Sequence, residues 1–127
     1  MKRKDELYYD QNIVEALEKL PSSIFDKKHN LTILVRNDQA RSNQTRFQHI
    51  ARKDHQLKVR DIESIPEGIN KYVRYVKSKT IKDTFYYYID RKGDDKGFIE
   101  VAILVDIMNK NIAYIKTIFI TYRIEEK

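Results

Sequence analysis

Two histidines, His49 and His55, lie close together in the chain, with Lys53 between them. An imidazole can accept or release a proton near neutral pH, and a neighbouring ammonium group can stabilise a developing negative charge. On a helix, His49 and Lys53 would share one face, and His55 would join them only if the helix ended near Asp54. The spacing therefore fits acid–base catalysis, but it fits equally a solvated helix face whose histidines have no chemical role.

A second group of candidate residues lies near the C-terminus, where alternate positions carry Thr117, Phe119, Thr121 and Arg123. Alternate residues of a strand share one face of a sheet. A guanidinium can bind phosphate through two hydrogen bonds, hydroxyls can add further hydrogen bonds, and an aromatic ring can stack on a base. This pattern favours contacts with a nucleic acid, with an ordinary solvated sheet face as the alternative.

The charge balance points the same way. The 127 residues include 25 Lys and Arg against 19 Asp and Glu, which gives a formal net charge of +6. Such an excess favours polyanionic partners, although it also aids solubility. Arg46 and Arg52 extend the basic face of the predicted histidine helix. We therefore expect the partner to be a nucleic acid, and RNA above all.

Composition excludes several other classes of protein. The absence of cysteine rules out disulfides and thiolate metal sites, and with three histidines we expect no metal and no cofactor. Three glycines without phosphate-loop spacing argue against a nucleotide-hydrolysing enzyme. The basic start is followed by Asp5 and Glu6 rather than by an apolar run, so we expect no signal peptide. No stretch approaches the roughly 20 apolar residues that span a bilayer, and we expect a cytoplasmic protein without a membrane partner.

The elements that must position these residues form a single α+β domain over residues 1–127, with an N-terminal helix and connector in residues 1–30. Helical spacing predicts a helix over residues 5–20, which Pro21 ends, and residues 22–30 are expected to be a polar connector. A buried strand is predicted at 31–35. A helix from Gln39 to about residue 57 follows, with Asn37 or Asp38 as its cap. A short helix at 61–69 would have Pro66 in its first turn and Gly68 at its exit.

The second half of the chain predicts strands. Four runs rich in β-branched and aromatic residues cover 72–77, 84–90, 98–106 and 114–123, and their short connections imply a four-stranded antiparallel meander. Alternation sends Tyr87 to one face of the sheet and its two tyrosine neighbours to the other. Two sets of alternate residues are expected to face the core: Ile99, Val101, Ile103, Val105 and Ile107 in the third run, and Ile118, Ile120, Tyr122 and Ile124 in the fourth.

Three short motifs occur in a recognisable order. His49-Ile50, followed by a basic residue and His55, resembles the helix signature of phage-borne nucleases of the barnase–EndoU–colicin–RelE class. Ile65-Pro66-Glu67-Gly68-Ile69 resembles the segment that follows that helix, and Phe119-Ile120-Thr121-Tyr122 resembles the last strand. The resemblance covers about residues 31–124, which would be the nuclease-like core.

The resemblance implies a helix-then-meander fold and metal-independent RNA cleavage, in which the ribose 2′-hydroxyl attacks the adjacent phosphate. His49 matches the first histidine of the signature, Lys53 stands where the signature has arginine, and Asp54 displaces His55 by one position. Thr121 matches the hydroxyl of the final strand. The catalytic candidates are thus His49, Lys53, His55 and Thr121, and the substrate-binding candidates are Arg46, Arg52, Thr117, Phe119 and Arg123.

The same resemblance implies a toxin or mobile-element ribonuclease with RNA as its partner, and it allows a protein inhibitor or antitoxin as a second partner. A different class of function is also open. A non-catalytic nucleic-acid-binding or regulatory module could use the same basic face on the same fold, because a fold does not fix its chemistry.

Overall fold

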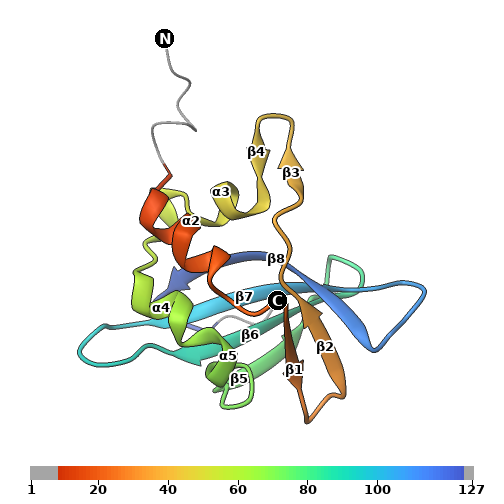
Figure 1. Cartoon of the computed structure of the whole chain (residues 1–127). Helices are drawn as coiled ribbons and strands as arrows, with labels where there is room; N and C mark the ends of the chain where they lie inside the picture. The colour runs from red at the N-terminus through yellow and green to blue at the C-terminus, as the bar shows by residue number, and fades with distance from the viewer. Residues whose placement is uncertain (1–8, 125–127) are drawn as a thin grey trace.

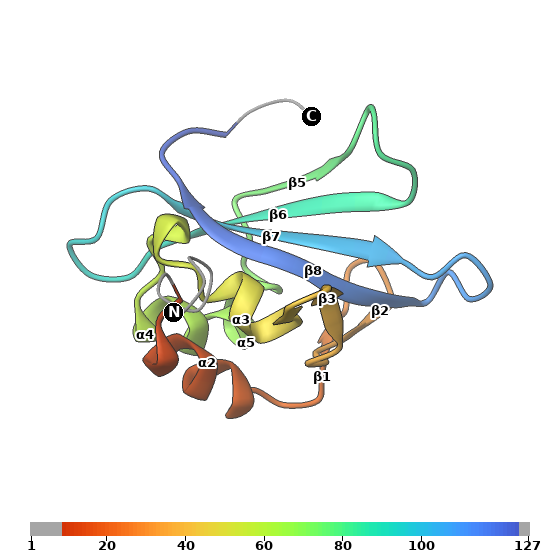
Figure 2. The ribbon, with the colours of Figure 1, turned by 90° about the horizontal axis from the view of Figure 1, so that it is seen from above.

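The computed structural model describes residues 9–124, which form helices packed on one face of a curled six-stranded sheet (Figures 1 and 2). The strand order across the sheet is β1 (Ser23–Asp26), β2 (Leu31–Leu34), β8 (Ile112–Thr121), β7 (Phe98–Val105), β6 (Thr84–Asp90) and β5 (Arg74–Lys77). The helices are α2 (Gln11–Glu18), α3 (Arg46–Ile50), α4 (Val59–Glu63) and α5 (Ile65–Gly68), with a 3₁₀ turn η1 (Lys53–His55). A separate small hairpin pairs β3 (Gln39–Arg41) with β4 (Gln44–Thr45).

The predicted meander is present as strands β5 to β8, which pair antiparallel in chain order. The predicted core face of β7 is confirmed for Ile99, Val101, Ile103 and Val105, which are all buried in the main core. It is wrong for Ile107, which follows the end of β7 and is exposed. A four-stranded meander preceded by helices is nevertheless wrong as a description of the whole fold. The β1–β2 hairpin extends the sheet, because β2 pairs in parallel with the start of β8.

The residues expected to be a polar connector therefore contain a strand. In β1 only Ile24 and Asp26 are buried, and both are flanked by exposed side chains. A strand of four residues is too short to show a clear alternation in the sequence. Its place is set by partners far away in the chain: Tyr87 donates a hydrogen bond from its hydroxyl to Asp26 Oδ2 at 2.6 Å, and Asn70 donates to the Phe25 carbonyl at 2.8 Å. These contacts join β1 to elements near the opposite edge, so the sheet curls.

The long helix expected from Gln39 onward is also wrong. The β3–β4 hairpin takes up its first half, and the helix α3 begins only after Thr45, whose side chain caps it in a capping box with Gln48. Asn37 still serves the helix from ten residues upstream, because its Oδ1 accepts the Phe47 N–H at 2.8 Å. Burial of Phe47 and Ile50 against the core fixes this short helix, where local propensity could not.

The remaining predictions are partly confirmed. Helix α2 starts after its cap Asp10 and buries Ile13 and Leu17, while residues 5–8 of the predicted helix lie outside the described part. Pro66 stands in the first turn of α5 as predicted, but Gly68 is the last helical residue rather than a cap. A Cβ on Gly68 would lie 2.6 Å from the Ile89 side chain, so this glycine allows α5 to pack closely on β6.

The sheet also has a second, smaller core on the face away from the helices. Tyr87 and its two tyrosine neighbours lie on opposite faces, as predicted: Tyr87 is in the main core, whereas Tyr86, Tyr88 and Ala102 form the second cluster. The prediction of a buried Tyr122 is wrong, because this residue follows the end of β8 and is exposed. Across the described part of the chain, no helix has the length and apolar character needed to cross a membrane.

Candidate functional site

The two histidines lie beside the outer edge of β8. Strand β2 covers that edge only from Ile112 to Tyr114, and no other strand of the described part pairs with the rest of it. Arg46 in α3 donates from Nη1 to the Lys116 carbonyl at 3.0 Å, and His55 in η1 hydrogen-bonds the backbone of Ile118. These two contacts hold α3 and η1 against the uncovered half of β8.

The fold brings His49 and His55 together, although not through a shared helix. Helix α3 ends at Ile50, so His49 and Lys53 do not have the predicted one-turn spacing on a helix face. The two imidazole rings instead meet edge to face, with their centroids 5.5 Å apart. The Phe119 ring lies 5.9 Å from that of His55, so an aromatic side chain of β8 adjoins the pair. Lys53 is exposed at the start of η1.

The electrostatic environment of His49 is unusual. Burial is the main cause that lowers the pKa of His49 from its ordinary value of 6.5 to about 4, and the charges of His55, Arg41, Arg52 and Arg46 contribute to this shift. The imidazole is therefore neutral at neutral pH, although cationic groups surround it. Its Nδ1 atom is buried and has no hydrogen-bond partner within residues 9–124. Unsatisfied buried polar atoms are rare, so each calls for a specific explanation.

His55 is held more firmly than His49. Its Nδ1 lies 2.9 Å from the Ile50 carbonyl oxygen, which fixes the orientation of the ring. Burial lowers the pKa of His55, and the nearby Asp54 carboxylate and the backbone hydrogen bonds oppose that shift in part. The Ile50 carbonyl can only accept, so the ring carries a proton on Nδ1 in this contact, and the same ring also hydrogen-bonds the backbone of Ile118.

Two of the predicted arginines, Arg46 and Arg52, are engaged with carboxylates. Arg46 reaches both oxygens of Asp38, at 3.0 and 3.4 Å, in addition to its bond to β8, and it lowers the pKa of Asp38. Arg52 makes two hydrogen bonds to Asp54, at 3.1 and 2.8 Å. Arg46 thus positions α3 on the sheet. Arg41 was not predicted as a site residue; it is exposed on the β3–β4 hairpin and adds to the positive charge around His49.

The candidate residues Thr117 and Phe119 of β8 share one face of the sheet. Thr117 and Phe119 lie opposite Ala102 and Glu100 of β7, on the face away from the helices. The Thr117 hydroxyl is buried and lacks a hydrogen-bond partner among the described residues, and the carbonyls of both its neighbours bond to Arg46 and His55. The site therefore forms where this face of the sheet meets the edge of β8.

The candidates Thr121 and Arg123 lie further along the chain, and a third residue near the site, Glu100, was not predicted. The Thr121 hydroxyl donates to the Arg123 carbonyl at 3.1 Å, at the end of β8, and Arg123 is exposed just beyond it. Glu100 is buried on β7 opposite Phe119 and brings a carboxylate to the same face. An acidic residue inside an otherwise apolar strand was the signal in the sequence that could have identified it.

The arrangement can bind an anion and exchange protons with it. Three arginines, two neutral imidazoles and two buried polar atoms that lack a partner among the described residues gather at one corner of the fold. No group of three or more His, Asp or Glu side chains suited to a metal ion occurs within residues 9–124. In comparisons with known proteins, no family model, no curated protein and no solved structure matches this chain.

Proposed function

We propose that the chain is a metal-independent RNA endonuclease whose site is the corner formed by α3, η1 and the edge of β8. The observation that carries the proposal is His49, a neutral imidazole with a pKa lowered to about 4 among Arg41, Arg46 and Arg52. The same positive field that opposes the imidazolium would stabilise a phosphate anion in that place. The negative charge of a bound phosphodiester would balance the positive charge of the arginines around His49.

The reaction that fits this site is an internal transfer at phosphorus. The ribose 2′-oxygen bonds to the adjacent phosphorus, and the bond from phosphorus to the 5′-oxygen of the next nucleotide breaks. One histidine takes the proton of the 2′-hydroxyl, and the other supplies a proton to the departing 5′-oxygen. The products are a 2′,3′-cyclic phosphate and a 5′-hydroxyl. Neither water nor a metal ion enters the balance.

Each candidate residue of the site, Arg41 included, has a role in this scheme. His49 and His55 exchange the protons, and the contacts of the His55 ring with the backbone of Ile50 and Ile118 hold it in place for this task. Phosphate charge is offset by Arg41, Arg52, Lys53 and Arg123, while Thr117 and Thr121 orient the phosphate and Phe119 contacts a base. Arg46 acts as a positioning residue, because its guanidinium bridges Asp38 and β8.

The test is a cleavage assay on mixed-sequence single-stranded RNA in the presence of a chelator. Cleavage with 2′,3′-cyclic phosphate ends is the expected result. Blocking the nucleophile with 2′-O-methyl ribose should stop the reaction without preventing binding. Cleavage that requires a metal ion, or products with 3′-hydroxyl ends, would refute the mechanism.

One observation favours a second function, that of a non-catalytic RNA-binding module. The pKa values of both histidines are lowered, mainly by burial, so the free protein holds few imidazolium groups that could act as an acid at neutral pH. A binder needs only the positive field. Salt-sensitive RNA binding by a protein that never cuts RNA would favour this alternative, because phosphate contacts release counterions.

A further inference from the structure

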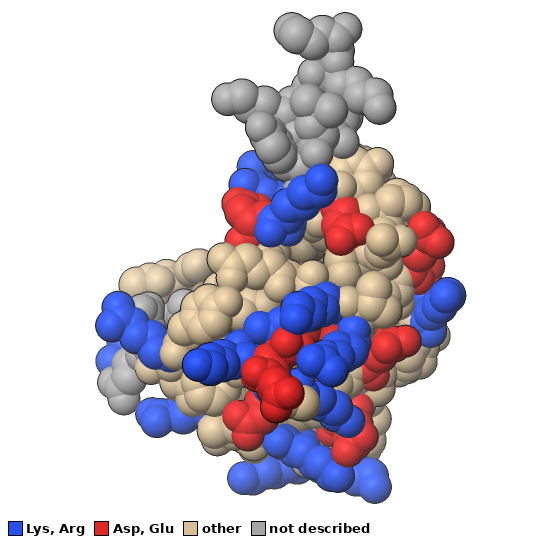
Figure 3. Space-filling view, turned by 90° about the vertical axis from the view of Figure 1, so that its left-hand side faces the viewer, with Lys and Arg blue, Asp and Glu red and all other residues tan. Residues whose placement is uncertain are grey.

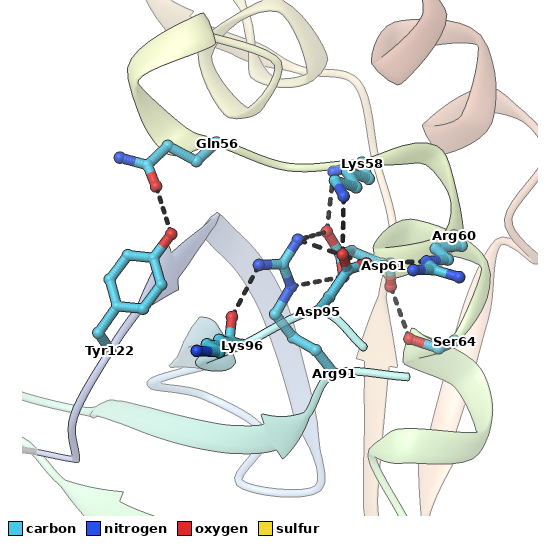
Figure 4. Close-up of polar contacts among 9 residues, drawn as sticks. All are labelled: Gln56, Lys58, Arg60, Asp61, Ser64, Arg91, Asp95, Lys96 and Tyr122. Atoms are coloured by element: carbon cyan, nitrogen blue, oxygen red, sulfur yellow. Dashed lines mark hydrogen bonds and ion pairs between the residues drawn. The ribbon is translucent and has the colours of Figure 1, made fainter. Parts of the chain in front are cut away.

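Tyr122 is exposed, yet its ring is fixed at two points. The side chain is 62% exposed, directly after the end of β8. Its hydroxyl donates to Gln56 Oε1 at 2.8 Å (Figure 4). On another side the ring packs on Gly97, because a Cβ at that glycine would lie 3.0 Å from Tyr122 Cδ1 and 3.2 Å from Cε1. An aromatic ring of this size is thus both open to solvent and held in place.

Both residues that hold the ring have left-handed backbone conformations. Gln56 has a φ of +62°, which is uncommon for a residue with a side chain. Gly97 has a φ of +92°, and a Cβ there would also lie 2.7 Å from the Thr121 carbonyl oxygen, so only glycine fits. The chain therefore adopts two special conformations at the contacts of one exposed ring.

A network of charged residues fixes the loop that carries Gly97. Arg91 and Asp61, both buried, form a two-point ion pair at 3.0 and 2.9 Å, and Arg91 Nη1 donates to the Lys96 carbonyl at 2.8 Å (Figure 4). Asp95 of the same loop binds Lys58 and Arg60 of the α4 segment. The backbone just before Gly97 is thereby tied to α4.

The ring adjoins the proposed RNA site. Gln56 follows His55 directly, and Tyr122 lies three residues beyond Phe119, whose ring contacts His55. On the side of the molecule that carries α4, Lys and Arg side chains surround a group of acidic residues (Figure 3). Lys58, Arg60 and Lys96 from this network are exposed. A nucleotide next to the bound phosphate would thus have cationic groups for its backbone and an open aromatic face for its base.

We infer that Tyr122 is a stacking platform for a nucleobase of single-stranded RNA, with Gln56 and Gly97 as the residues that position it. This inference rests on the proposed RNA site and adds its base-binding part. Stacking on an aromatic ring suits single strands, because every base has a π-face, and a ring held in advance loses little freedom on binding. The platform serves the proposed nuclease and the binding module alike.

A fluorescence experiment tests the platform directly. The chain has no tryptophan, so Tyr122→Trp introduces a single fluorescent indole at the platform. A short 2′-O-methyl oligoadenylate, which cannot be cut through its 2′-oxygen, should quench this fluorescence on binding. An abasic oligomer of equal length and charge should bind without quenching. The matched control is Phe25→Trp, because Phe25 is 48% exposed on β1, and its fluorescence should respond to neither oligomer.

Affinities then separate this inference from the proposed function. Tyr122→Ala should weaken oligoadenylate binding roughly 5- to 100-fold and leave abasic binding unchanged. Gln56→Ala should cause a smaller loss with the same dependence on bases, which a general structural defect would not show. If Tyr122→Ala binds oligoadenylate as tightly as the wild type, the platform is refuted while the RNA site stands. If the wild-type protein binds neither oligomer, both proposals fall.

Discussion

The chain holds its histidines in two opposite ways. At the β1–β2 turn, His29 Nδ1 lies 2.6 Å from Asp26 Oδ2, and the ring stacks on Tyr75 with centroids 4.0 Å apart. Asp26 is fully buried and also accepts hydrogen bonds from the Tyr87 hydroxyl and the His29 backbone N–H. At the corner beside β8, His49 has cations around it and a buried nitrogen without a partner in the described part of the chain.

The difference distinguishes a structural cluster from a candidate site. In the Asp26 cluster, a buried carboxylate faces an imidazole and a phenol, and burial raises the pKa of both Tyr75 and Tyr87. Its polar groups complete one another, and the cluster joins β1 to β6 in the curled sheet. In the β8 corner, Arg46 and Arg52 are paired with carboxylates, but His49 Nδ1 and the Thr117 hydroxyl have no hydrogen-bond partner among the described residues. We therefore expect mutations in the first region to change stability and mutations in the second to change RNA chemistry.

The largest effect should come from His49→Ala. Removing a positioned acid or base typically lowers a reaction rate on the order of 100- to 10,000-fold. His29→Asn is the matched control: it removes an imidazole from the structural cluster and should leave the RNA cleavage rate within about twofold, since it removes no acid or base. Cleavage rates on one RNA, with thermal unfolding as a check on folding, measure both. A His49→Ala protein that cuts RNA at the wild-type rate would show that His49 is not an acid or base in the reaction.

The next effect concerns stability. Asp26→Ala should lower the free energy of unfolding by about 3 kcal/mol or more, because it breaks a buried pair and leaves the Tyr87 hydroxyl without its acceptor. Denaturant unfolding of Asp26→Ala and of wild type gives the difference. Under conditions where the variant is folded, its RNA affinity should match that of the wild type. A stable variant with lost RNA binding would instead assign the cluster to the site.

The third prediction concerns protonation of His49. Its pKa of about 4 in the free protein reflects burial and neighbouring cations, and a bound anion offsets the cations. Sulfate, which stays a dianion over this pH range, should therefore raise the pKa of His49, which NMR titration of the imidazole signals measures. By linkage, sulfate affinity should increase as pH falls from 7 towards 4, in the window between the bound and the free pKa. His29 signals should not respond to sulfate, and an unchanged His49 titration would contradict the proposed anion site.

The lowered pKa of His49 also determines whether the free energy of unfolding rises or falls with pH. The pKa of His49 is depressed below 6.5, so the unfolded chain binds more protons than the folded one between pH 6.5 and about 4. The neutral imidazole therefore contributes to the free energy of unfolding above pH 6.5, and this contribution is lost as the pH falls from 6.5 to about 4. His49→Gln should therefore flatten the fall in unfolding free energy over that range. A wild-type protein whose stability rises on acidification through the window would contradict the burial of a neutral His49.

The two regions also show what the sequence could predict. Strand β6 matches its predicted bounds, and β7 and β8 lie close to theirs, because long strands repeat their alternation often enough to be recognised. Two short elements, β1 and α3, owe their conformation to distant partners and were not predicted, whereas the apolar run of the equally short β2 was recognised. His49 and His55 do meet, but through an edge-to-face contact after a helix break. Nothing in the sequence distinguished His29 as the structural histidine. Its partner Asp26 is placed by the β1–β2 turn and by a hydrogen bond from the distant Tyr87, which no local pattern shows.

The smallest expected effect separates the charge at the β8 corner from the net charge of the protein. Arg41→Ala removes an exposed cation whose field reaches His49, and Lys27→Ala removes an exposed cation from the β1–β2 turn. Both variants have the same net charge. If Arg41 contacts phosphate, its loss should reduce the slope of log affinity against log salt concentration by about 1, whereas the Lys27 variant should keep the wild-type slope. RNA titrations at several salt concentrations decide between them. Equal slopes for the two variants would mean that RNA responds to overall charge alone, and Arg41 would then have no place in the site.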